Sequence, residues 1–119
     1  MTTRVVSKYR TNRWDVSITR GTYKSRSKWG NPYPLRSRED LDVVECLLKH
    51  ARYLRESGLI DDVHELRGQT LACVCAPARC HGDTLARCAG AADPRAELDD
   101  ILEELEAERA KLDAQQSLI

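Results

Sequence analysis

The sequence predicts an α/β protein: a small mixed sheet with packed helices and a C-terminal acidic helix. Residues 70–75 form a short apolar run between Gly68 and Pro77, which suits a buried central strand. Residues 14–19 alternate apolar and polar side chains, the period of a strand with one buried face. Residues 41–54 instead repeat apolar side chains every three or four positions, which indicates a helix. Strand and helix patterns therefore alternate along one short chain.

Length and composition favour one globular unit. The chain has 119 residues, enough for one domain and too few for two independent cores. It contains no run of about 18 apolar residues and no signal peptide, so we expect a cytoplasmic protein with no membrane partner. Its five cysteines are an odd number, which favours reduced thiols over a disulfide framework.

The zero net charge conceals a strong polarity along the chain. Residues 1–38 carry ten Lys or Arg and one acid, residues 39–92 carry six and nine, and residues 93–119 carry three and nine. The basic first third predicts an anionic partner such as a nucleotide or nucleic acid, or contact with the chain's own acidic tail. The alternative is a set of scattered, solvated charges.

Two strands are expected near the N-terminus. Residues 4–8 include a Val-Val pair and residues 14–19 show the alternating pattern, so we predict antiparallel neighbours joined by residues 9–13. Residues 21–36 then lack a helical period and contain two prolines, which predicts a long functional loop.

This loop interleaves basic and aromatic residues. We expect Lys28 and the preceding Arg20 to bind phosphate, Trp29 to stack on a base and Asn31 to position the ligand. In the alternative interpretation, Trp29 only caps the core and the residues after it form a turn.

The remaining patterns are helical. A helix begins at Ser37 and ends before Gly58, and residues 60–66 are a short second helix. The acidic tail, residues 93–119, opens with Asp-Pro and carries an apolar stripe. It packs on the domain, contacts the basic first third, or pairs with a second copy; of these we prefer a homodimer. The stripe consists of Leu98, Ile101, Leu102, Leu105 and Leu112.

The turn after the central strand is the expected site, because ligands collect where a parallel strand ends and a helix begins. Cys73 and Cys75 are two apart on the predicted strand, so their thiols share a face, and the turn could bring Cys80 and His81 to the same point. Four ligands of this kind would complete a tetrahedral zinc site, although the spacing differs from paired Cys-x2-Cys motifs.

Two other interpretations of the same residues stay open. In one, Cys80 is a catalytic thiol at a helix N-terminus, its pKa lowered by Arg79 or His81, with Asp83 orienting His81. In the other, the cysteines are small core residues and the turn faces a ligand without a covalent role.

Two motifs carry a resemblance to a known family. The first is Ser-Lys-Trp-Gly-Asn-Pro at residues 27–32, and the second is Cys-x-Cys-Ala-Pro-x2-Cys-His-Gly-Asp at residues 73–83. Together they resemble the domain of unknown function family 4326 of bacteria and their phages, and the second is also similar to uncharacterised family 488. The resemblance covers roughly residues 4–91 and implies a compact α/β domain with a shared pocket but no reaction. Residues 9–14 and 21–27 are longer and more basic than the family suggests, and the acidic helix lies outside it.

We therefore expect a compact domain over residues 1–91 and an acidic amphipathic helix over residues 92–119. The two motifs should meet in one pocket, formed by residues 28–32 and 79–83, that binds a nucleotide or a nucleic-acid phosphate group and acts on it with Cys80, His81 or Asp83. The alternative is a noncatalytic phage or bacterial module that contacts a host protein in the host cytoplasm through its basic loop and acidic helix.

Overall fold

The fold is built on a small parallel sheet. The structure of the protein is a computed structural model that describes residues 2–19, 27–75 and 78–117. Its strands are β1 (Arg4–Ser7), β2 (Val16–Ser17) and β3 (Thr70–Cys73), in the order β1-β3-β2. Both pairings are parallel, with Val5 and Val16 each opposite Leu71. The α/β class is confirmed, and residues 70–73 form the central strand.

The prediction of antiparallel N-terminal neighbours was wrong. β1 and β2 do not pair with each other, because β3 lies between them and runs in the same direction as both. An alternating pattern identifies a strand but carries no information on its direction. The most apolar strand takes the centre, where both faces are covered. Among the described residues the sheet is parallel, not mixed.

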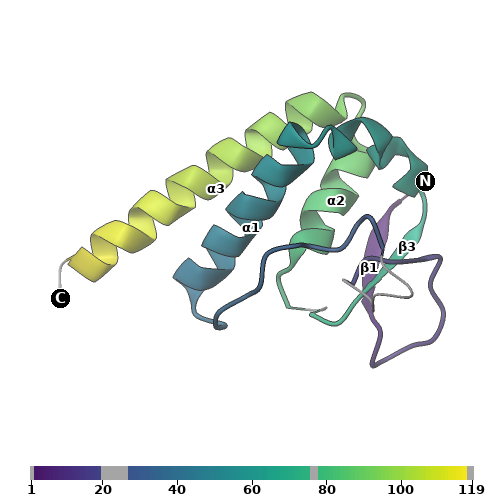
Figure 1. Cartoon of the computed structure of the whole chain (residues 1–119), viewed down its shortest axis with the longest axis horizontal. Helices are drawn as coiled ribbons and strands as arrows, with labels where there is room; N and C mark the ends of the chain where they lie inside the picture. Colours follow the sequence, from purple (N-terminus) through teal and green to yellow (C-terminus); the bar gives the residue numbers. More distant parts are fainter. Residues whose placement is uncertain (1, 20–26, 76–77, 118–119) are drawn as a thin grey trace.

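The helices pack beside this sheet and against one another (Figure 1). They are α1 (Asp40–Glu56), the 3-10 helix η1 (Leu59–Leu66), α2 (His81–Gly90) and α3 (Pro94–Ser117). α1 begins three residues after Ser37, whose hydroxyl accepts the Glu39 backbone N–H. It ends before Gly58, whose φ of 80° lies in the left-handed region that only glycine adopts at low cost.

The acidic helix α3 packs on its own domain. It runs alongside α1 and also contacts α2 and η1 (Figure 1). Four residues of its predicted stripe are buried and belong to the same core as the residues of α1 and η1: Leu98, Ile101, Leu102 and Leu105. Of the three arrangements weighed for this helix, the structure shows the first. The homodimer stays a prediction.

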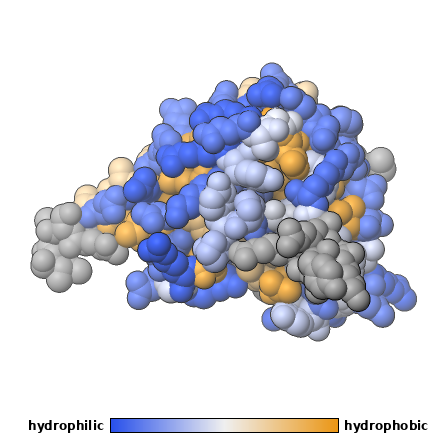
Figure 2. Space-filling view, in the orientation of Figure 1, coloured by the Kyte–Doolittle hydropathy of each residue, from blue (hydrophilic) through white to orange (hydrophobic). Residues whose placement is uncertain are grey.

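Ion pairs also join α3 to the other helices. Arg52 of α1 contacts Glu106, and Arg87 of α2 contacts Glu97 and Glu104. Hydrophilic residues cover most of the face shown in Figure 2, with smaller hydrophobic patches between them. Within the part of the chain that the structure describes, no helix is both long and apolar enough to cross a membrane.

Candidate functional site

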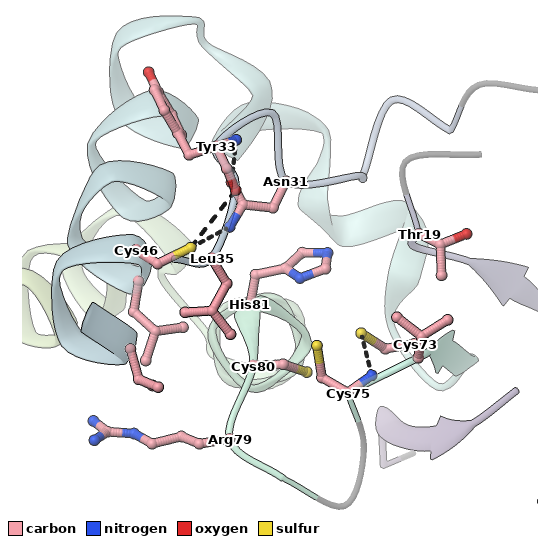
Figure 3. Close-up of a pocket in the computed structure, with 13 residues that line it drawn as sticks. Thr19, Asn31, Tyr33, Leu35, Cys46, Cys73, Cys75, Arg79, Cys80 and His81 are labelled. Carbon is pink, nitrogen blue, oxygen red and sulfur yellow. Dashed lines mark hydrogen bonds between the residues drawn. The ribbon is translucent and has the colours of Figure 1, made fainter. Parts of the chain in front are cut away.

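A cavity of about 210 Å³ opens where the loop before α1 meets the turn before α2. It lies at the carboxyl end of the central strand, the edge at which α/β sheets bind ligands. Both sequence motifs reach it, since Asn31 lines it from one side and Cys80 and His81 line it from the other (Figure 3). Its other walls are formed by Thr19, Tyr33, Leu35, Val43, Cys46, Leu47, Cys73, Val74, Cys75 and Arg79.

Two thiols and an imidazole form a cluster at one end of this cavity. Cys73 is the last residue of β3, and Cys80 and His81 lead into α2. One ligand atom from each lies within 4.8 Å of the others, and all three residues are buried. The turn is fixed by Asp83, whose carboxylate accepts the Cys80 backbone N–H at 3.0 Å at the start of the helix.

The orientation of His81 follows from one hydrogen bond. Its Nε2 lies 2.8 Å from the backbone carbonyl oxygen of Ile18. A carbonyl oxygen only accepts, so Nε2 donates a proton to Ile18, and Nδ1 is the ring nitrogen left for other contacts. The sulfur atoms of Cys73, Cys75 and Cys80 gather beside this ring (Figure 3).

A second histidine packs against the ring of His81. His50 of α1 packs edge-on against His81 with ring centroids 5.0 Å apart. Its Nδ1 is buried and has no hydrogen-bond partner among the described residues. Burial, and secondarily the neighbouring His81, lower the pKa of His50 to about 3, so this ring is neutral at physiological pH.

The hydrogen bonds divide the two buried thiols into a donor and an acceptor. Donation from the Cys80 thiol, and further donation from His81 and the Cys75 amide, lower the pKa of Cys73 to about 4. The same contact with Cys73, together with burial, raises the pKa of Cys80. Cys73 is therefore the thiolate of the pair, whereas the sequence pointed to Cys80. Burial raises the pKa of Cys88 to about 12, so that thiol is inert.

Cys75 stands at the edge of this cluster. It lies beyond the end of β3, lines the cavity and is half-buried, and its sulfur is outside the group of three atoms within 4.8 Å. Burial is the main cause that raises the pKa of its thiol, and the Arg38 guanidinium is close enough to donate to its sulfur. Arg38 thus brings a positive charge to the rim of the cavity.

Arg79 brings a second guanidinium group to the same cavity, but another element holds it. It donates to both carboxylate oxygens of Glu108 on α3, at 2.6 and 2.7 Å. A neighbouring cavity of about 200 Å³ between α2 and α3 shares Arg79 and Cys80 with the first, and Asp83 lines only this second one.

Lys28 and Trp29, two of the expected ligand residues, do not line the cavity. Trp29 is 3% exposed and lies in the core, with Nε1 donating to Glu65 at 3.1 Å, as the alternative interpretation had it. Lys28 forms an ion pair with the same carboxylate at 2.9 Å. Arg20 lies outside the described residues.

Asn31 shapes the loop as well as the cavity. Its Oδ1 accepts the Tyr33 backbone N–H at 3.0 Å, and its Nδ2 donates to Cys46 Sγ at 3.3 Å. Sequence reasoning missed Cys46, Arg38 and Tyr33. The signal for Cys46 was its position off the apolar stripe of α1, which turns it toward the loop.

Comparison with known proteins agrees with the two motifs. The family described as "Domain of unknown function (DUF4326)" matches residues 3–91. Over 85 residues the chain is 38% identical to the "Uncharacterized 12.4 kDa protein in nrdA-td intergenic region" of Enterobacteria phage T4, covering 70% of this chain and 73% of that protein. No solved structure matches significantly. By its family match and its phage relative, the chain belongs to the DUF4326 family.

Proposed function

We propose that the cavity is a reaction site for a small ligand with an anionic group, such as a nucleotide phosphate, and that the cluster of Cys73, Cys80 and His81 acts on that ligand. One observation carries the proposal. Two motifs about 50 residues apart in the sequence line one cavity, and the side chains at its end are a thiolate, a thiol and an imidazole. Such a grouping offers both a nucleophile and acid–base groups.

The charge at the cavity supports an anionic ligand. Arg79 is one of its lining residues and Arg38 lies beside Cys75 at its rim. Guanidinium groups bind phosphate oxygens in a bidentate manner. In this structure the Glu108 carboxylate accepts both hydrogen bonds of the Arg79 guanidinium. A phosphate in the cavity would compete for the same N–H groups.

The size of the cavity limits what it holds. At about 210 Å³ it is smaller than the roughly 300–1,000 Å³ typical of sites for whole drug-sized ligands. It therefore takes one end of a ligand, and the rest lies across the rim. Because Trp29 is in the core, a base would not stack on it, and the anionic group is the feature recognised.

Ligand-induced stabilisation of the full chain tests the proposal. The melting temperature is measured with phosphate, pyrophosphate and nucleoside mono- and triphosphates. A ligand at about 100 times its Kd should raise Tm by about 10 °C. Arg79→Gln should remove this shift. Arg52→Gln, which also loses an ion pair to α3 but lies away from the cavity, should retain it.

Turnover is tested separately from binding. Each ligand that stabilises the chain is incubated with it, and the products are analysed by mass spectrometry. Cys73→Ser should abolish turnover, whereas Cys88→Ser should preserve it. The absence of stabilisation by every compound would overturn the proposal and leave the noncatalytic interaction module.

A further inference from the structure

We propose that Cys73, Cys80 and His81 bind one zinc ion and leave its fourth coordination position open to the cavity. The presence of the ion stands on the geometry of the three side chains alone. Its role toward a ligand rests on the function proposed above: with the ion bound, the three side chains would act on the ligand through the metal, and not as a free nucleophile and free acid–base groups.

The separation of the three ligand atoms fits a single tetrahedral ion. Zinc binds sulfur at about 2.3 Å and nitrogen at about 2.0 Å, which places neighbouring ligand atoms about 3.5 to 3.8 Å apart. The atoms of the cluster already lie within 4.8 Å of one another. Only small side-chain movements would therefore close them around an ion.

The hydrogen bond of His81 is the one a zinc-bound histidine needs. Metal-ligating histidines donate their second ring N–H to a carboxylate or a backbone carbonyl, which fixes the ring and its tautomer. Here Nε2 donates to Ile18 O at 2.8 Å, so Nδ1 is the available ligand atom. The edge contact with the buried His50 restrains the ring further.

The donor set selects the metal. Two thiolates and one imidazole are soft to borderline ligands, which favour zinc over magnesium or calcium. Three protein ligands with one free position is the arrangement of catalytic zinc sites, in which water or substrate takes the fourth place. The Cys73 and Cys80 ligands also line the cavity, as does His81, so the free position faces the ligand space.

Cys75 decides between an open and a closed site. Its thiol lines the same cavity, and as a fourth ligand it would make a closed, structural centre. It lies outside the group of three ligand atoms and beside the Arg38 guanidinium, so we assign it no bond to the ion.

Metal analysis of the full chain, purified without added chelator, tests the site. Elemental analysis should find one zinc per chain. After chelation, Co²⁺ should produce thiolate charge-transfer bands and the intense visible bands of tetrahedral cobalt. Cys73→Ser should weaken Co²⁺ binding at least about 100-fold, since even loss of an outer partner costs roughly 10- to 100-fold. Cys46→Ser, a cavity cysteine outside the cluster, should leave binding unchanged.

Three results would overturn the inference. They are the absence of stoichiometric zinc together with no tetrahedral Co²⁺ spectrum, unchanged Co²⁺ affinity in Cys73→Ser, and loss of the metal in Cys75→Ser, which would show a closed four-ligand site. Circular dichroism of each variant confirms that the fold is retained.

The same samples separate this inference from the proposed function. If the purified chain contains zinc but no anionic compound stabilises it, the proposed function is wrong and the metal site is retained. Stabilisation by an anionic compound in metal-free protein, with no zinc in the purified chain, would do the reverse. If both hold, adding the stabilising compound to the Co²⁺ form should shift its visible bands, because the ligand reaches the fourth position.

Discussion

Gly82 determines how closely the start of α2 approaches the sheet. A Cβ atom at this position would lie 2.8 Å from Ile18 Cδ1 and 3.0 Å from both methyl groups of Val5. Ile18 is fully buried, so it can give way only by displacing its neighbours in the core. The residues before Gly82 are Cys80 and His81, so the glycine sets the distance between the cluster and the strand ends.

We expect Gly82→Ala to destabilise the protein by about 1 to 3 kcal/mol, the usual cost of overpacking a core. Gly90→Ala, at the other end of α2, is the matched control, because nothing lies within 4 Å of a Cβ there. It should be neutral or stabilise by up to about 1 kcal/mol. Urea unfolding followed by circular dichroism measures both, and equal stability of the two variants would contradict the close approach.

His50 predicts a dependence of stability on pH. Its pKa falls from 6.5 in the unfolded chain to about 3 in the folded one. Between these values the unfolded state binds a proton that the folded state does not, so stability is lost as the pH falls. The free energy of unfolding should decrease by about 2 kcal/mol from pH 7 to pH 5 through this residue.

Two variants isolate this contribution. His50→Leu should flatten the pH profile, whereas His64→Gln, at an exposed position on η1, should leave it unchanged. Unfolding is measured in the presence of a chelator, so that metal binding at the adjacent His81 does not contribute. The same slope in His50→Leu and in the unmodified chain would show that His50 titrates normally.

At this scale the sequence identified the cluster but not its surroundings. Cys73, Cys80 and His81 were predictable because a strand end followed by a helix start brings them together. Trp29 was not, since basic residues beside an aromatic look the same in a ligand loop and over a core. The burial of Trp29 is accompanied by a hydrogen bond to Glu65, which is 36 residues away and which no local sequence pattern connects to it.

Between elements, the pair of Arg79 and Glu108 is the contact that bears on function. Both side chains are more than a third exposed, at 46% and 38%, so the pair contributes at most about 1 kcal/mol to stability. It nevertheless joins α3 to the residue that lies between the two cavities. An anionic ligand would have to compete with Glu108 for the guanidinium.

Glu108→Gln should therefore increase the affinity for an anionic ligand by up to about fivefold, the equivalent of 1 kcal/mol. Glu106→Gln provides the control, because it releases Arg52 on α1 instead. Isothermal titration calorimetry with the ligand found by thermal shift measures both affinities. Unchanged or weaker binding in Glu108→Gln would show that Arg79 does not bind the ligand.

The direction of the strands could not be predicted from the sequence, because it too depends on contacts between residues far apart in the chain. The residue pattern of 4–8 and 14–19 fixes which side chains face inward, and only the long-range pairing with β3 fixes direction. α3 shows the opposite case. Its stripe was predictable residue by residue, and what covers it was not, because a partner helix and a second copy both satisfy the same pattern.

For the molecule as a whole, α3 completes the core rather than extending from it. The family match ends at residue 91, but the apolar residues of α3 share one buried cluster with those of α1, α2 and η1. Among the described residues, both the family region and the C-terminal helix therefore contribute to the same hydrophobic core.

This shared core predicts the cost of truncating an apolar residue of α3. Ile101 is 3% exposed on α3. Ile101→Ala should lower the free energy of unfolding by about 2 to 5 kcal/mol, because the cavity left behind lies in the shared core. Glu103→Ala, two residues along on the exposed face, should change stability by less than about 0.5 kcal/mol. Packing of the stripe within one chain predicts an unfolding midpoint that does not depend on protein concentration, whereas the homodimer expected from the sequence predicts one that rises with it. A midpoint that rises with concentration, and falls to that of the monomer in Ile101→Ala, would instead show that two copies share the stripe as a dimer.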